Sequence, residues 1–324
     1  MNFSKRDFLK YGAAVGAGVA VPAWAQGKPL FEALNMFVPA APGGGWDSTA
    51  RALERSAKAA GLVGNMQFEN VGGAGGMVGL PRFVNQRKGQ GNSLMVGGSV
   101  MVGAAIANKS PVTMKDVTPI ARLTEEAGVL VVPANGKVKT WNDLLAALKE
   151  NPKAVSVAGG SAGGTDHLIL GLMIKALGRN PRDAAYVAFA GGGPANAAIL
   201  GGQVTAGISG YSEFEEQIKA GRMVALATSG RARIPGVNVP TMAELGLNVV
   251  MANWRGVFAP PGISDSQRGA LTDFVTRTVA SEAWKNELVT RKWSDAFLSE
   301  RPFEREVGWD IERITVVMKD LGLA

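Results

Sequence analysis

The sequence predicts an α/β protein of two lobes, each with a mostly parallel sheet flanked by helices. Its 324 residues exceed the length of a typical single domain, so two lobes are the default expectation. At four places along the chain, an apolar strand-like run is followed by a glycine-rich loop and then by an apolar helix-like run. Strands that alternate with helices through short loops form right-handed crossovers, which place the strands in parallel.

The first of these places has its strand at residues 34–38 and a helix that ends near Gly61. Asp47 is the predicted N-cap of that helix, because aspartate is a favoured residue at this position. Proline is tolerated in a first helical turn, so Pro194 indicates where the helix of the last place begins. The other three strand-loop-helix units span residues 93–108, 154–178 and 185–209.

Each of the four junctions places glycines between the end of a strand and the start of a helix. In open α/β sheets, ligands bind beyond the carboxyl ends of the strands, where such loops lead into helices. A helix N-terminus offers free N–H groups and a partial positive charge, and glycine lets a ligand approach that backbone closely. The pattern indicates an anion-binding site between two lobes, although each loop alone is also typical of a tight turn.

Residues 1–25 are predicted to be a signal peptide. Basic residues precede the short apolar stretch 13–21, and the Ala-Trp-Ala sequence that ends at Ala25 fits a cleavage site. The opening SKRDFLK resembles a twin-arginine signal with Lys5 at the place of the first arginine, so the twin-arginine and the general export routes both stay open. No later segment has 18 uninterrupted apolar residues. We therefore expect a soluble periplasmic protein, cleaved after Ala25.

Composition and charge exclude several functions. The formal net charge of +7 becomes +5 when the signal peptide, with three basic residues and one acidic residue, is removed. The remaining Lys and Arg residues are scattered, which argues against nucleic-acid binding and is compatible with an acidic small molecule. The chain has no cysteine, so disulfides, thiol nucleophiles and thiolate metal sites are excluded.

Enzyme motifs have little support. Neither the dinucleotide-binding spacing G-x-G-x-x-G nor a P-loop is complete in the mature chain, and one histidine matches no metal-site pattern, so we expect no metal or other cofactor. The sequence GGSAG (159–163) satisfies the nucleophile pattern G-x-S-x-G, which keeps a serine esterase using Ser161 as an alternative. The only histidine, His167, lies on the helix that follows Ser161, from where it can hardly act as the base. We therefore expect no catalytic residues.

Six motifs occur in a fixed order: VPAAPGGGWDSTAR, ENVGGAGG, GGSAGGTDHL, GGGPANAAILGGQV, SGYSEF and NWRGVFAPPGI. Together they resemble the extracytoplasmic solute-binding proteins of tripartite tricarboxylate transporters, over about residues 35–324. Trp46 after three glycines is similar to the tricarboxylate (citrate) branch of that family. The resemblance implies a periplasmic-binding-protein fold of type II, a Venus flytrap whose lobes close on a small di- or tricarboxylate.

The resemblance also implies partners. Such a protein delivers its ligand to the large and small integral-membrane components of a tripartite transporter, which is driven by an ion gradient without ATP. We expect it to be a monomer. An exported carboxylate sensor or scaffold stays open as an alternative, because it would use the same kind of binding site.

A two-lobed protein of this type crosses between its lobes twice, and we place the crossings near residues 124–129 and 249–254. The C-terminal part then returns to the first lobe as two amphipathic helices, at 264–281 and 304–322. The resulting division is lobe 1, residues 26–126 plus 250–324, and lobe 2, residues 127–249.

By resemblance, the ligand lies between the loop 42–49 of lobe 1 and the loop 159–165 of lobe 2. Backbone N–H groups, hydroxyl groups and one guanidinium are expected to bind it. The predicted ligand-binding residues are Gly43, Gly44, Gly45, Trp46, Ser48, Thr49, Ser99, Gly160, Ser161, Gly164, Thr165, Gly192, Gly193 and Arg255.

Several of these residues have two open roles. The hydroxyl groups either donate to the ligand or cap their helices, and Arg255 either binds a carboxylate or forms a structural ion pair at the hinge. Trp46 donates from its indole or forms a wall, and it is not expected in the core. Where the family often carries charged residues, this chain has Phe189-Ala190 and Ser209-Gly210-Tyr211. That difference favours a ligand with carboxylates and no ammonium group.

Overall fold

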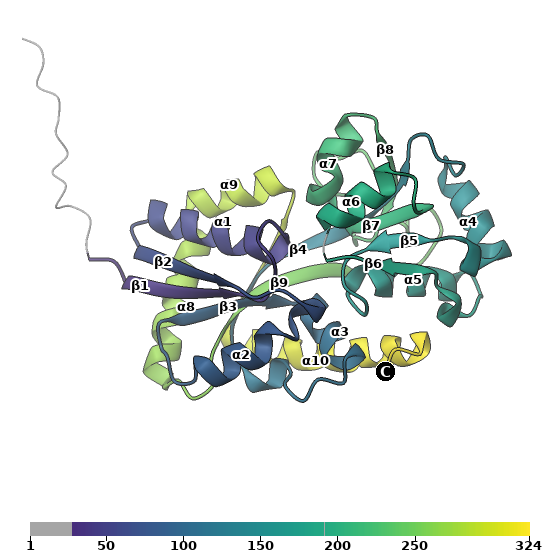
Figure 1. The fold of residues 1–324 in the computed structure, drawn as a ribbon. Coiled ribbons are helices and arrows are strands. Elements are labelled where there is room, and N and C mark those ends of the chain that lie inside the picture. Colours follow the sequence, from purple (N-terminus) through teal and green to yellow (C-terminus); the bar gives the residue numbers. More distant parts are fainter. Residues whose placement is uncertain (1–27, 191) are drawn as a thin grey trace, which may run out of the picture.

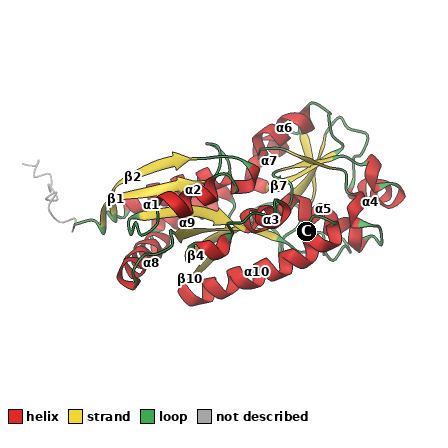
Figure 2. Ribbon diagram, turned by 60° about the horizontal axis from the view of Figure 1, so that its bottom comes forward, coloured by secondary structure: helices red, strands yellow, loops and turns green. Residues whose placement is uncertain are grey.

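Two sheets share one long strand, β4 (Thr118–Pro133), which joins the two halves of the molecule (Figure 1). The computed structural model describes residues 28–190 and 192–324. The predicted signal peptide and its cleavage site at Ala25 lie outside the described residues. Helices pack on the sheets of both lobes, as the colouring by secondary structure shows (Figure 2).

The first sheet has the strand order β2-β1-β3-β9-β4, and β10 pairs with β4 as well. Its elements are β1 (Phe31–Val38), α1 (Gly45–Ala59), β2 (Val63–Asn70), α2 (Gly79–Gln86), β3 (Ser93–Gly98), α3 (Ser99–Ala107), β9 (Ala252–Ala259), α8 (Asp265–Ala280), α9 (Glu282–Arg291), β10 (Ser294–Ser299) and α10 (Glu300–Leu321). Strand β1 is parallel to β2 and β3, as the glycine junctions predict. Strand β9 is antiparallel to both β3 and β4.

The second sheet continues from β4 through β7 and β5 to β6, and β8 pairs with β4. Its further elements are α4 (Trp141–Glu150), β5 (Val157–Gly159), α5 (Thr165–Ala176), β6 (Tyr186–Ala188), α6 (Gly192–Leu200), β7 (Ala206–Gly210), α7 (Tyr211–Lys219) and β8 (Met223–Thr228). Strand β5 is parallel to β6 and β7, whereas β4 runs antiparallel to β7 and β8. Parallel pairing therefore belongs to the strand-loop-helix units, and antiparallel pairing to the strands that connect them.

Strand β4 changes its partner where it leaves the first sheet. Its residues up to Ala127 pair with β9, and the residues from Gly128 onward pair with β7. Strand β9 begins at Ala252, directly opposite Ala127, so the two connections between the sheets lie side by side. We propose this change of partner as the lobe boundary. The division of the chain at residues 126/127 and 249/250 stays a prediction.

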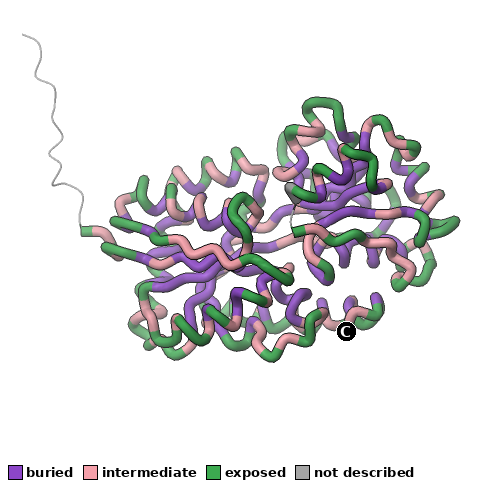
Figure 3. Tube along the Cα trace, viewed as in Figure 1, coloured by how far each residue is buried: buried purple, intermediate pink, exposed green. Residues whose placement is uncertain are grey.

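Within residues 28–190 and 192–324, the apolar side chains form one core in the first lobe and two in the second. The inner strands of both sheets are buried (Figure 3), and in the first lobe the rings of Trp254, Phe258 and Phe303 pack together. The second lobe has one core under α4 and α5 and another under α6 and α7. Helix α10 starts in the first core, and its last turn reaches α5, where Leu321 packs against Gly171.

Gly98→Ala is expected to lower the free energy of unfolding by about 1–3 kcal/mol, because the added methyl group would collide with the main-chain oxygen of Trp254. Urea unfolding measures the change. Gly269→Ala in α8 is the control, since nothing lies within 4 Å of its added methyl group. This control should stabilise its helix by about 0.5–1 kcal/mol. Equal stability of both variants would contradict the close packing of β3 on β9.

Candidate ligand-binding site

Helices α1, α3 and α5 begin next to the strands that join the lobes, and each has glycine at its N-cap. These residues are Gly44, Gly98 and Gly164, and no side chain in the described part of the chain caps the three helix starts. Helices α4, α8 and α9 differ, because Thr140, Ser264 and Ser281 accept first-turn N–H groups there. The N–H groups at the starts of α1, α3 and α5 are therefore available to an anion.

Two hydroxyl groups hold α3 and α5 against each other. Ser99 Oγ lies 3.1 Å from Thr165 Oγ1 and donates to Asn253 Oδ1 of β9 at 2.9 Å, so Thr165 is the donor to Ser99. Both hydroxyl-bearing residues are buried. Glycine occupies each N-cap, so neither hydroxyl group caps its helix from that position. Their contact with a ligand stays a prediction.

A buried ion pair joins β9 to β4. Arg255 Nη2 is 2.7 Å from Glu126 Oε2, and the two residues are 3% and 1% exposed. Glu126 Oε1 also accepts the N–H and the hydroxyl of Ser212 in α7, at 3.1 and 2.6 Å. A methyl group on Gly45 would lie 2.8 Å from Arg255 Nη2, so glycine lets the guanidinium lie against the start of α1. The structural role that we considered for Arg255 is thus present.

Arg255 nevertheless keeps one donor free. Its Nη1 is buried and has no hydrogen-bond partner within residues 28–190 and 192–324. An unpaired donor on a buried charged group costs free energy unless a partner arrives. The role of Arg255 as a carboxylate partner therefore stays a prediction that this geometry favours.

An aspartate in the first turn of α1 and of α5 fixes the glycine loop in front of the helix. Asp47 Oδ2 accepts the N–H of Gly43 at 3.0 Å, and Asp166 Oδ2 accepts the N–H of Gly160 at 2.9 Å. The prediction that Asp47 is the N-cap is wrong: Gly44 holds that place, and Asp47 bonds back to the loop from within the helix. Burial raises the pKa of Asp47, but the bond from Gly43 and other polar neighbours outweigh it and lower the pKa.

The side chains of the first loop are largely occupied. The ring of Trp46 belongs to the core of lobe 1 and packs against Gly76, where an added methyl group would lie 3.1 Å from it. This contradicts the expectation that Trp46 lies outside the core. Thr49 Oγ1 donates to the carbonyl of Gly45 at 2.8 Å, and Ser48 is partly exposed. Ligand contacts of these side chains stay predictions.

The loop of lobe 2 touches lobe 1 through Ser161. A methyl group on Gly75 would lie 3.5 Å from Ser161 Cβ, so the two lobes are in contact at this point. Gly192 and Gly193 begin α6 and follow Gly191, which lies outside the described residues. Their ligand contacts are not tested by this geometry and stay predictions.

His167 has a structural environment. The N–H of Gly163 donates to its Nδ1 at 3.2 Å, and its ring stacks on Tyr186 with 4.3 Å between centroids. Burial lowers the pKa of His167 to about 4, so the ring is neutral at pH 7 and its proton is on Nε2. No hydrogen bond joins His167 to Ser161 within the described residues. The geometry therefore does not favour the serine esterase alternative.

Three carboxylates that the sequence analysis did not assign converge near α5 and α7. They belong to Asp166 of α5, Glu213 of α7 and Glu126 of β4. Burial and the charges of Glu213 and Glu126 raise the pKa of Asp166 to about 7. Burial, together with the charge of Glu126, also raises the pKa of Glu213. These charges come from the first turns of α5 and α7 and from β4, and not from residues 189–190 and 209–211.

Asp166, Tyr186 and Glu213 of lobe 2 have similar surroundings. Burial by surrounding protein raises the pKa of all three groups. Each side chain nevertheless keeps intermediate exposure to solvent. Protein therefore covers these groups without sealing them from water. The candidate site thus combines N–H donors and one guanidinium with two carboxylates of lobe 2. These are Asp166 and Glu213, which we call the acidic wall.

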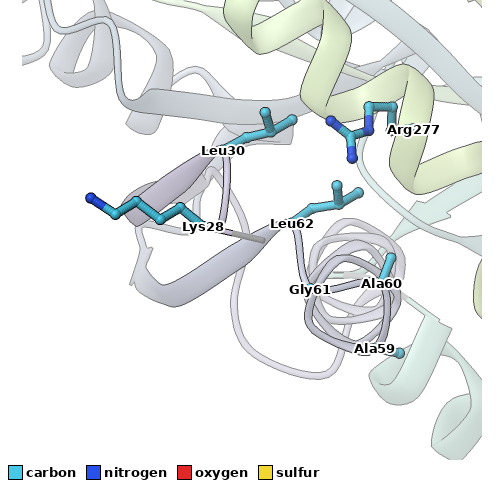
Figure 4. A pocket seen from close by; sticks show the side chains of 7 residues that line it. All are labelled: Lys28, Leu30, Ala59, Ala60, Gly61, Leu62 and Arg277. Carbon is cyan, nitrogen blue, oxygen red and sulfur yellow. The ribbon is translucent and has the colours of Figure 1, made fainter. Parts of the chain in front are cut away.

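Two surface hollows of lobe 1 lie elsewhere. The first, of about 190 Å³, lies at the end of α1 and is lined by Lys28, Leu30, Ala59, Ala60, Gly61, Leu62 and Arg277 (Figure 4). The second lies beside β1 and β2 and is lined by Asn35, Met36, Phe37, Gln67, Phe68, Glu69, Arg87 and Ser93. Neither includes the start of α1, α3 or α5, so we assign the ligand to neither.

The described residues show no group of side chains that could hold a metal ion. In the same part of the chain, no helix has the length and apolar character needed to cross a membrane.

The protein has two α/β lobes with two adjoining connections, and helix starts from both lobes meet beside a buried arginine. These features define a periplasmic solute-binding protein. The chain belongs to the tripartite tricarboxylate transporter family of receptors, whose family model matches residues 50–323. A model of the twin-arginine translocation signal matches residues 2–22. The predicted family and periplasmic location are confirmed, while cleavage after Ala25 stays a prediction.

Individual relatives agree with this assignment. BugT of Bordetella pertussis is 30% identical over 275 residues, which are 82% of each chain. MatC from Rhodopseudomonas palustris, solved with bound malate, is 26% identical with a TM-score of 0.75 over 89% of this chain and 99% of that one. The periplasmic binding protein BugD is 23% identical with a TM-score of 0.78 over 90% and 98% of the chains, which shows the fold alone. The predicted α/β periplasmic-binding-protein fold is confirmed.

Glu126→Ala is expected to lower the free energy of unfolding by about 3–5 kcal/mol, because it leaves the buried charge of Arg255 without its partner. Chemical denaturation measures the loss. Glu125→Ala at the neighbouring, partly exposed position is the control and should cost less than about 1 kcal/mol. Similar losses in both variants would contradict a stabilising role for the buried ion pair between β4 and β9.

Proposed function

We propose that this protein captures a small carboxylate between its two lobes and delivers it to the membrane components of a tripartite transporter. One observation carries the proposal: the uncapped starts of α1, α3 and α5 come from both lobes and meet beside Arg255. First-turn N–H groups and a guanidinium are the donors that carboxylate oxygens accept best. The receptor family to which the chain belongs supports the same function.

The ligand that we propose is a di- or tricarboxylate. MatC, a relative of 26% identity, was solved with malate, and a dicarboxylate can bind one helix start in each lobe. Citrate is the finer proposal, and it rests on the resemblance of the triple-glycine loop and Trp46 to the tricarboxylate branch. We propose that the backbone N–H groups near Gly44 and Gly164, with Arg255 between them, are the principal donors.

Both lobes are needed on energetic grounds. A micromolar dissociation constant corresponds to about −8 kcal/mol, and a hydrogen bond to a charged group contributes about 1.5–3 kcal/mol. Association and ordering cost several kcal/mol more. One glycine loop does not supply that sum, whereas two loops and a guanidinium do. Binding therefore favours the closed arrangement of the lobes, which is the form that a membrane partner has to recognise.

The proposed partners are the large and small integral-membrane components, with an ion gradient as the driving force. We propose that the receptor acts as a monomer. Transport of the bound carboxylate by cells that hold both membrane components, and its loss when the receptor is deleted, would distinguish delivery from an exported sensor.

Thermal unfolding of residues 26–324 with single carboxylates tests the ligand class. Citrate, tricarballylate, isocitrate, malate, succinate, glutamate and terephthalate form the panel, with a neutral sugar as the control. A ligand at about a thousand times its dissociation constant stabilises the native state by about 4 kcal/mol, which raises the melting temperature by several degrees. We expect this rise with malate or a tricarboxylate and none with the sugar. A protein without bound ligand that responds to no carboxylate would overturn the proposal.

Gly44→Ser tests whether the start of α1 binds the ligand. The backbone at Gly44 is extended, and an added Cβ has only one neighbour, at 3.7 Å, so serine fits there. Its hydroxyl would cap α1 and occupy a first-turn N–H, raising stability by a few tenths of a kcal/mol. We expect carboxylate affinity, measured by calorimetry, to fall about tenfold.

Gly44→Ala is the matched control. Alanine adds the same Cβ without a hydroxyl, so the N–H groups stay free and affinity should remain within about twofold, although α1 loses some stability. If serine and alanine change the affinity equally, the start of α1 is not a ligand donor.

A further inference from the structure

Asp166 and Glu213 of lobe 2 carry more negative charge than the cations near them compensate. Besides burial, the charges of Glu213 and Glu126 raise the pKa of Asp166, and the charge of Glu126 raises that of Glu213. Within residues 28–190 and 192–324, Arg255 is the one cation that lowers both pKa values. Arg255 is already paired with Glu126 at 2.7 Å, and that carboxylate also accepts two bonds from Ser212. In the part of the chain that the structure describes, Asp166 and Glu213 are thus left without a cation of their own.

The neutral partners of these two carboxylates do not remove the excess charge. Asp166 accepts the N–H of Gly160 at 2.9 Å, and Glu213 accepts the hydroxyl of Ser209. Other groups nearby are uncharged at pH 7: His167 is neutral, and Tyr186 has a pKa well above its ordinary value because of burial and the charge of Asp166. Two carboxylates that repel each other and lack a cation cannot both stay ionised at low cost.

A second, independent feature indicates that an anion binds at this place. Arg255, only 3% exposed, has a free donor at Nη1, while its Nη2 is bound to Glu126. The uncapped starts of α1 and α5 also favour an anion. An ionised ligand at these donors would face two further negative charges on lobe 2. That conflict is resolved if the acidic wall carries a proton when the ligand is bound.

We propose that Asp166 and Glu213 couple ligand capture to proton uptake: the site binds a carboxylate together with one proton, which the Asp166–Glu213 pair holds and donates to a ligand oxygen. The protonation state of these two residues thereby determines when the site accepts a polyanion. The proposal rests on the proposed function, because it needs a carboxylate at the site. The raised pKa values of both groups agree with it, since each already favours the protonated form.

The affinity for malate should fall as the pH rises. Asp166 has a pKa of about 7 in the protein without ligand, so the binding-competent protonated form is abundant below pH 7 and scarce above it. The dissociation constant for malate should therefore rise about tenfold between pH 6 and pH 8. At pH 8 binding should take up about one proton per malate.

Calorimetry of malate binding at pH 8, in buffers of different ionisation enthalpy, counts the protons. In Asp166→Asn the amide keeps an acceptor for Gly160 and supplies an N–H donor, so we expect tighter binding than in the wild type at pH 8. Proton uptake should be lost and the dissociation constant should be nearly equal at pH 6 and pH 8. Asp265→Asn, at an exposed aspartate in the first turn of α8, is the control and should keep the uptake.

The outcomes separate this inference from the proposed function. Malate that binds with no proton uptake, or uptake that persists in both Asp166→Asn and Glu213→Gln, overturns the inference and leaves carboxylate capture intact. Loss of malate binding in Asp166→Asn, with tight binding of aspartate to the wild type, overturns it in favour of an ammonium group at the acidic wall. Failure of malate and of every other carboxylate in the panel overturns both proposals.

Discussion

The ion pair between Glu126 and Arg255 is the interaction on which the rest of the structure depends. It joins the two strands that connect the lobes at the point where β4 changes sheets, and both charges are buried. Burial makes each charge costly without the other, so the pair fixes β4 against β9. Through Ser212 the same pair reaches α7 of lobe 2, and at Gly45 the guanidinium lies against α1 of lobe 1. One interaction thus sets the relative position of helix starts from both lobes.

The use of helix caps shows how stability and binding are divided in this fold. Serine and threonine cap α4, α8 and α9, where each cap contributes about 1 kcal/mol. Glycine at the N-caps of α1, α3 and α5 makes no such contribution and leaves the first-turn N–H groups free. Aspartates 47 and 166 offset part of the loss by fixing the preceding loops without covering the helix starts. Side-chain caps therefore stabilise α4, α8 and α9, whereas the helix starts beside the connecting strands keep unused hydrogen-bonding capacity.

The fold follows from the sequence because its signals are local. Each strand-loop-helix unit shows its own periodicity, and the late helices at 264–281 and 304–322 appear as α8 and α10. The glycine loops and Arg255 are visible for the same reason. The convergence of Asp166, Glu213 and Glu126 is not visible in the sequence, because these residues lie far apart along the chain and meet only after two sheets have formed. Asp166 alone gives a signal, because it follows its glycine loop as Asp47 follows the first.

The loop around Ser161 shows why a site for an anion differs from a hydrolase site. A nucleophile elbow and a carboxylate site share a strand, a tight loop and a helix start that stabilises negative charge. A hydrolase needs in addition a base that accepts the serine proton. Here the one histidine accepts a backbone N–H at Nδ1, stacks on Tyr186 and stays neutral through burial. The shared backbone geometry thus stabilises a negative charge that the ligand brings with it, rather than one that develops during a reaction.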